Sequence, residues 1–143
     1  MGRILAVDFG LKRVGLAVTD PLQIIASSLE TIHPKELTTY FTNYFQKEKV
    51  DLVVFGMPRR LDGTDTDITG HVKGLVGIFR KLFPEIQFTT HDERYTSAIA
   101  LKSMIASGTS KKDRRTKGNL DMVSATIILQ SYMESCELQN KNL

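Results

Sequence analysis

Apolar residues form short, nearly continuous runs in five places along the chain, each bounded by glycine, proline or polar residues. Runs of this length and composition are typical of buried β-strands. Gly10 and Gly15 punctuate the first two runs, which are close enough in sequence to form a hairpin. The pattern therefore predicts strands at residues 3–9, 13–20, 28–32, 50–55 and 86–91, of which 28–32 is the weakest.

Between and after these runs, apolar residues recur every three or four positions, which is the spacing of one buried helix face. Pro34 suits the first turn of a helix, Pro84 ends another, and Gly108 stops a third. The predicted helices cover residues 34–49, 68–83, 96–107 and 120–136. An opening meander followed by strand–helix alternation predicts an α/β fold, with a mixed sheet and helices on both faces.

The composition is that of a globular domain. The chain has 143 residues, of which 41% are hydrophobic and 24% charged, enough to bury one ordinary core. We expect one domain over residues 1–138 and a frayed tail at 139–143. No apolar run approaches the roughly 20 residues of a membrane span, the start does not resemble a signal peptide, and Cys136 is the single cysteine. These features predict a cytoplasmic protein without a membrane partner.

Positive charge is concentrated in one segment. Residues 108–119 hold five basic residues against one acid, a local charge of +4, which leaves −1 for the rest of a chain whose net charge is +3. The basic residues are Lys111, Lys112, Arg114, Arg115 and Lys117. Such a segment attracts phosphate through Coulomb energy and counterion release. A solvated linker is the simpler interpretation of an isolated basic run, but this run directly precedes a candidate catalytic acid.

Asp8 is the first candidate for chemistry, because a carboxylate within an apolar strand is costly to bury unless it is paired or binds a metal. Open α/β sheets place their sites at the carboxyl ends of strands, where Asp8 is expected. A turn-capping aspartate beside Gly10 explains this residue equally well. Asp92 and Glu93 also follow a predicted strand. Strand alternation points them to opposite sides, so only one should face the site. We select Glu93, partly on the family resemblance given below, with Asp62 in reserve.

Asp121 lies in the first turn of the last predicted helix, on the inward face that also holds Ala125 and Ile128. A favourable interaction with the helix macrodipole is the alternative role for this acid. Three converging carboxylates make a hard-oxygen site that suits Mg²⁺ or Mn²⁺, whereas zinc would favour His or Cys ligands. The chain has no P-loop and no nucleophile elbow, and His91 is the one histidine close to the acids.

The order of these motifs resembles the YqgF/RuvX family. The motifs are Asp8-Phe-Gly-Leu-Lys12-Arg13-Val-Gly15-Leu-Ala-Val-Thr-Asp20, Gly56-Met-Pro58 with Asp62-Gly63, Asp92-Glu93-Arg94, and Asp121 with the helix Ser-Ala-Thr-Ile-Ile-Leu-Gln130-Ser-Tyr132. The likeness extends from residue 3 to about residue 134. Each motif is weak by itself, but four in this order are specific.

The resemblance implies an RNase H-like fold of about five strands and a nuclease related to Holliday junction resolvases that matures the 5′ end of pre-16S rRNA. By the same resemblance Asp8, Glu93 and Asp121 would be the catalytic, metal-binding acids, and Lys12, Arg13 and Arg94 would contact phosphate or brace the acids. This chain departs from the family at Tyr95-Thr96-Ser97, where Leu-Thr-Thr is commoner, and at Asn119, where a lysine is frequent. Neither departure affects an acid; both leave substrate preference open.

Two other classes of function compete with a nuclease. The pattern Asp8-x-Gly-x-x-x-x-Gly15 also resembles the first phosphate loop of actin-like ATPases, which need two lobes where this chain supplies one. A non-catalytic RNA-binding or ribosome-assembly factor on the same fold is the second alternative. The sequence leaves open whether RNA or branched DNA is the substrate, and whether the protein is a monomer or a homodimer.

Overall fold

The computed structural model describes residues 2–58, 64–92 and 117–141, with the side chains of the last helix described from 124 to 136. Within these residues five strands form one sheet in the order β3-β2-β1-β4-β5. The strands are β1 (Arg3–Phe9), β2 (Val14–Thr19), β3 (Ala26–Ile32), β4 (Val50–Met57) and β5 (Gln87–Asp92). The pairs β1–β2 and β2–β3 are antiparallel, whereas β1–β4 and β4–β5 are parallel. The predicted mixed sheet is confirmed, and β1 is its central strand.

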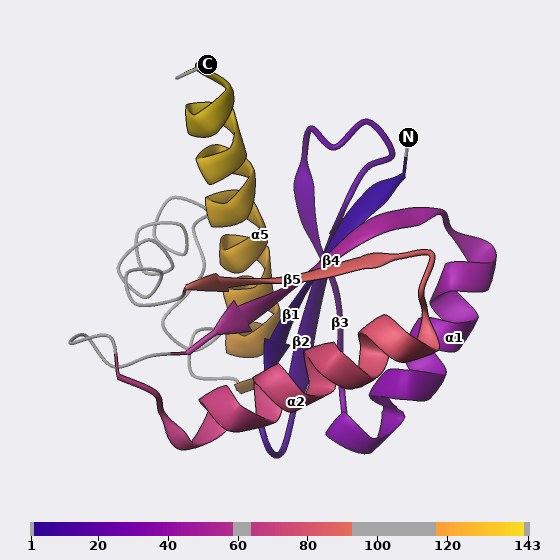
Figure 1. The fold of residues 1–143 in the computed structure, drawn as a ribbon, viewed down its shortest axis with the longest axis vertical. Helices are drawn as coiled ribbons and strands as arrows, with labels where there is room; N and C mark the ends of the chain where they lie inside the picture. The colour runs from indigo at the N-terminus through magenta and orange to yellow at the C-terminus, as the bar shows by residue number, and fades with distance from the viewer. Residues whose placement is uncertain (1, 59–63, 93–116, 142–143) are drawn as a thin grey trace.

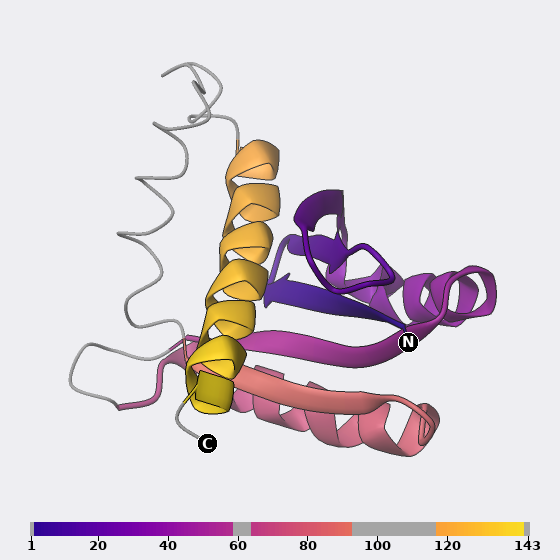
Figure 2. The same ribbon diagram turned by 90° about the horizontal axis from the view of Figure 1, so that it is seen from above.

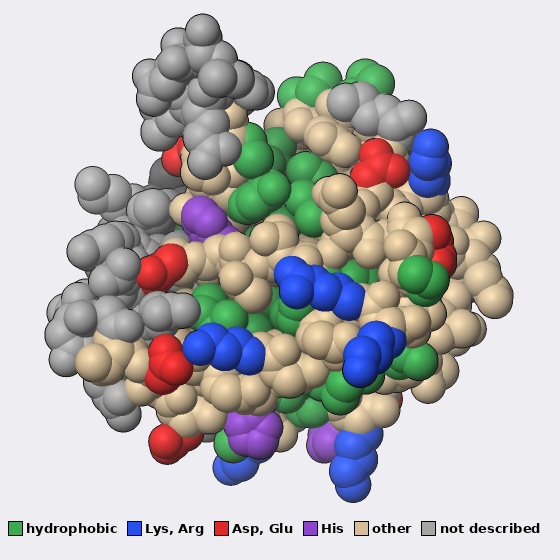
Figure 3. All heavy atoms as spheres, viewed as in Figure 1, with side chains coloured by type: hydrophobic (Ala, Val, Ile, Leu, Met, Phe, Trp, Pro, Cys, Tyr) green, Lys and Arg blue, Asp and Glu red, His purple; other side chains and the backbone are tan. Residues whose placement is uncertain are grey.

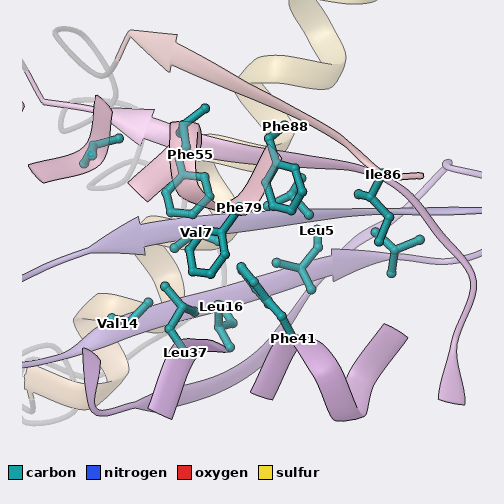
Figure 4. Packing of buried hydrophobic residues seen from close by; sticks show 14 of the residues in the cluster. Leu5, Val7, Val14, Leu16, Leu37, Phe41, Phe55, Phe79, Ile86 and Phe88 are labelled. Carbon is teal, nitrogen blue, oxygen red and sulfur yellow. The ribbon is translucent and has the colours of Figure 1, made fainter. Parts of the chain in front are cut away.

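One face of the sheet is covered by α1 (Leu37–Lys47) and α2 (Asp67–Leu82), as Figure 1 shows. The inward side chains of β1 and β2 on this face are Leu5, Val7, Val14 and Leu16. Phe41 of α1 lies at the centre of an aromatic cluster, with its ring 5.0 Å from that of Phe79 in α2 (Figure 4). Burial of these side chains is the main force that holds both helices on the sheet.

The opposite face is covered by α5 (Lys117–Lys141), which packs mainly on β1, β2 and β3. Alanines meet at this contact, with Ala6, Ala17 and Ala125 all fully buried. Small side chains let the helix approach the sheet closely. Figures 1 and 2 both show the N-terminal half of α5 passing the arrowhead of β1, at the end of that strand where Asp8 lies.

Several boundaries differ from the sequence prediction. β3 begins at Ala26, two residues early, because its pairing with β2 continues to Thr19. The predicted helix from residue 34 starts as a 3-10 turn, Pro34–Glu36, before α1. α5 extends from Lys117 to Lys141, so it includes both the end of the predicted basic loop and residues 139–141 of the predicted tail. The helix predicted at 96–107 lies outside the described residues.

Candidate functional site

Asp8 lies at the carboxyl end of the central strand, between two glycines. It pairs with Gly15 of β2 on one side. On the other side, Val7 pairs with Phe55 of β4, so the next step in the same register places Asp8 level with Gly56. Residues level with one another in a sheet point to the same face. The two neighbours of Asp8 in this row, Gly15 and Gly56, therefore add no side chain to the face that α5 covers.

Face assignment follows from the burial of the neighbouring residues. Ile4 and Ala6 of β1 contact α5, whereas Leu5 and Val7 contact the α1 and α2 side. Because side chains alternate along a strand, Asp8 belongs to the α5 face. The carboxylate is half-buried and has further interactions within the molecule. Asp8 thus lies at the end of the interface between the sheet and α5 and not within the aromatic core.

Two cationic residues lie in the turn that follows β1. The N–H of Gly10 donates to the carbonyl of Arg13 at 2.9 Å, which closes the turn. A Cβ on residue 10 would lie 2.8 Å from that carbonyl oxygen, so only glycine fits. Lys12 is exposed and Arg13 half-buried, and both line a shallow hollow of about 320 Å³ with Ile68. The turn thus places two cations at the same edge of the sheet as Asp8.

His91 occupies the same row as Asp8, because it pairs with Gly56 in the parallel β4–β5 ladder. Its Nε2 is 2.8 Å from Oγ of Ser131 in α5, and its ring meets Tyr132 edge-on with centroids 5.9 Å apart. Burial lowers the pKa of His91 below its ordinary value of 6.5, against the opposing charge of Asp92. The neutral imidazole is therefore favoured. The sequence pattern singled out His91 but indicated no partner for it. The position of Ser131 beside the inward residues Ile128 and Tyr132 could have indicated that it faces the sheet.

Asp92 belongs to the other face of the sheet. It pairs with Met57, which is buried in the core beneath α1 and α2 together with Phe88. Its exposed carboxylate has partners within the molecule. Glu93 lies outside the described residues, so the preference for Glu93 over Asp92 stays a prediction.

The end of β4 is fixed to α2 by Thr69, which is fully buried. Its hydroxyl donates to the carbonyl of Pro58 at 2.6 Å and accepts from the N–H of Thr66 at 2.8 Å. The second bond belongs to a capping box at the start of α2. These bonds hold the strand beside Asp8 at the point where the chain leaves the sheet.

The remaining predicted residues fall outside what the structure describes. They are Glu93, Arg94, Lys111, Lys112, Arg114, Arg115 and the reserve residue Asp62. Lys117 and Asp121 are in the first turns of α5, but their side chains are not described. Within the described ranges, no group of three His, Cys, Asp or Glu could hold a metal ion. The residues that the structure does bring to one edge are Asp8, Lys12, Arg13 and His91.

The charged side chains of the described residues are scattered over the surface in view in Figure 3. Over the face in Figure 3, lysine and arginine side chains of the described residues are spread out, with acidic side chains between them. Asp8 supplies hard oxygen donors beside two residues that have no side chain. Donors of this kind fit Mg²⁺ or Mn²⁺, and cations in the next turn fit a phosphate group.

Comparison with known proteins identifies the family. The model of the RuvX family, described as Holliday junction resolvase, matches residues 2–135. The chain belongs to the RuvX family. A relative from Amoebophilus asiaticus is 49% identical over 135 residues, 94% of this chain and 96% of its own length. A second, from Flavobacterium johnsoniae, is 45% identical over 94% of this chain and 98% of its own. Both carry the name "Putative pre-16S rRNA nuclease".

A solved structure supports the fold predicted for this RuvX family member. RuvC of T. thermophilus, in complex with a Holliday junction substrate, superposes with a TM-score of 0.56 at 13% identity. The match covers 93% of this chain and 96% of the RuvC chain. The five-stranded mixed sheet is therefore RNase H-like, as predicted. In the part of the chain that is described, no helix is long and apolar enough to cross a bilayer.

Proposed function

We propose that this protein is a metal-dependent endonuclease that hydrolyses phosphodiester bonds in structured RNA, with the 5′ end of pre-16S rRNA as its substrate. The observation that carries the proposal is the position of Asp8. It lies on the central strand, at the carboxyl end, between Gly15 and Gly56 on the face that α5 covers. Open α/β folds bind their ligands at this end of the sheet.

The proposed metal ligands are Asp8, Glu93 and Asp121, with Mg²⁺ or Mn²⁺ as the ion. A divalent ion in such a site would activate water and neutralise charge on a phosphodiester. Asp8 would hold the ion at the end of β1, and the flanking glycines would leave room for a phosphate oxygen. Lys12 and Arg13 would bind the phosphate group from the β1–β2 turn, where Lys12 is exposed.

The substrate contacts would extend beyond this edge. Arg94 and the basic residues Lys111, Lys112, Arg114, Arg115 and Lys117 would contact neighbouring phosphates, because the positive charge of the chain is concentrated there. RNA is the first choice of substrate, since relatives at 49% and 45% identity carry a pre-16S rRNA nuclease name. A cytoplasmic location follows from this choice.

Branched DNA is the second candidate substrate. The description of the family model names a Holliday junction resolvase, and the RuvC structure was determined with such a junction. Both substrates present phosphodiesters, so the same acids and cations would serve either of them.

One set of cleavage assays separates these possibilities. The protein is incubated with a 16S precursor fragment, a four-way DNA junction and linear duplexes, in Mn²⁺, in Mg²⁺ and in excess EDTA. We expect metal-dependent cleavage of the precursor near the mature 5′ end. Preferential cutting of the junction would favour the DNA function. RNA binding without cleavage in any metal would favour a non-catalytic assembly factor, and tight ATP binding would favour an ATPase.

A further inference from the structure

His91 connects the end of β5 to α5. β5 is an edge strand that pairs with β4 alone. On the face where His91 lies, α5 packs mainly on the strands toward the opposite edge, β1, β2 and β3. From β5, His91 forms a hydrogen bond of 2.8 Å with Ser131 of α5, and its ring meets that of Tyr132 edge-on. A side chain in this position can fix the distance between the end of β5 and the helix.

We propose that His91 and Ser131 form a positioning brace that sets the affinity of the site for its divalent ion. This inference rests on the proposed function, because β5 ends one residue before the proposed ligand Glu93 in the sequence, and α5 contains the proposed ligand Asp121. Glu93 follows His91 by two residues, and Asp121 precedes Ser131 by ten on the same helix. Neither braced residue is itself a ligand in this proposal.

The brace acts along the row that contains Asp8. His91 pairs with Gly56, which lies level with Asp8, so a hydrogen bond from His91 to α5 holds sheet and helix together on the face of the carboxylate. The outer edge of β5 has a separate support, since Arg80 of α2 donates to the carbonyl of Phe88 at 2.9 and 3.2 Å. That contact fixes the start of the strand, whereas His91 fixes its carboxyl end.

Outer partners of this kind strongly affect a metal site. Their loss typically lowers metal affinity by about 10- to 100-fold, because the ligands are no longer held at the separation that the ion requires. A role in folding alone has a different signature. It lowers the melting temperature and the fraction of active protein but leaves the affinity of the folded molecules unchanged.

The test measures Mn²⁺ binding to the full chain without nucleic acid, by calorimetric titration or by the electron paramagnetic resonance signal of free Mn²⁺. His91→Phe keeps an aromatic ring beside Tyr132 but loses the hydrogen bond, and Ser131→Ala removes one hydroxyl. We expect each to raise the Mn²⁺ dissociation constant about tenfold. The double variant should be no weaker than the worse single one, because both changes break one interaction. Ser131→Thr keeps a hydroxyl at this position and should bind Mn²⁺ like the wild type.

Ser135→Ala is the matched control, since that hydroxyl lies one turn further along α5 and donates to the carbonyl of Tyr132 in its own helix. It should bind Mn²⁺ like the wild type. Folded variants of His91 and Ser131 with wild-type Mn²⁺ affinity would overturn the brace, and so would effects that simply add. If His91→Phe does not fold, Ser131→Ala decides alone. A wild-type protein that binds no Mn²⁺ would instead overturn the proposed function, and the brace with it.

Discussion

Asp8 and His91 occupy one row of the sheet, on the face covered by α5, with Gly56 between them. Two strand steps separate their backbones by about 10 Å. A gap of this width would take one ion, or the two ions roughly 4 Å apart of a two-metal site. The glycine between them keeps this space free of side-chain atoms.

Asp8→Asn should abolish metal-dependent cleavage and leave the fold intact, because it removes a charge but little volume. A cleavage time course and circular dichroism should be recorded on the same preparation. Glu85→Gln, an exposed acid in the turn before β5, is the charge-matched control and should cut at the wild-type rate. Full activity in Asp8→Asn would remove this residue from the site.

Gly56→Ala should weaken Mn²⁺ binding and cleavage, because a methyl group would enter the row between Asp8 and His91. Gly74→Ala provides the control for the same chemical change. Its added Cβ would meet nothing within 4 Å, and alanine is the better helix former, so stability should rise by up to about 1 kcal/mol. Normal Mn²⁺ affinity in Gly56→Ala would show that the gap has no role.

Glu93→Gln and Asp92→Asn should differ. The first should lose cleavage, whereas the second should keep cleavage and lose some stability, because Asp92 is on the face opposite Asp8 and has partners within the molecule. Cleavage rates and urea midpoints separate the two effects. If Asp92→Asn lost cleavage and Glu93→Gln kept it, the assignment of the two acids to opposite faces would be reversed. If both variants cleave normally, the third ligand lies elsewhere.

Replacement of Lys111, Lys112, Arg114, Arg115 and Lys117 by serine should weaken RNA binding and flatten its salt dependence. Each lost phosphate contact should reduce the slope of log affinity against log salt by about one unit. The matched control replaces five exposed lysines of the described residues, namely Lys35, Lys47, Lys49, Lys73 and Lys81. This control variant has the same net charge as the variant of the basic segment. Its slope of log affinity against log salt should stay closer to that of the wild type. Equal slopes in both variants would return the basic segment to the status of a linker.

Wild-type stability should fall more steeply than that of His91→Phe as the pH drops from 7.5 to 5.5. Burial lowers the pKa of His91 in the folded protein below 6.5, so the unfolded chain takes up the proton first. The stability difference is therefore fully present above about pH 6.5 and is lost as the pH falls through the lowered pKa. Urea unfolding at both pH values measures it. The two proteins differ only at residue 91, so the comparison isolates the effect of His91. Parallel curves would contradict the lowered pKa.

The sequence alone determined the alternation of strands and helices, the mixed sheet and the place of Asp8 near the end of a strand. These features depend on local patterns: the period of the apolar residues, the glycines and prolines at element ends, and the cost of a charge in an apolar strand. Boundaries were less accurate. β3 begins earlier than predicted because its pairing with β2 continues to Thr19, and α5 runs longer than predicted.

Only the tertiary structure decided which residues share the site. No sequence pattern indicated a partner for His91, because Ser131 is 40 residues away and reaches it only when α5 lies across the sheet. The same holds for the two glycines beside Asp8, which come from different strands and meet in one row through backbone pairing. Register between strands is set by long-range hydrogen bonds and by burial of one face, and neither is encoded in the spacing of residues along a single segment.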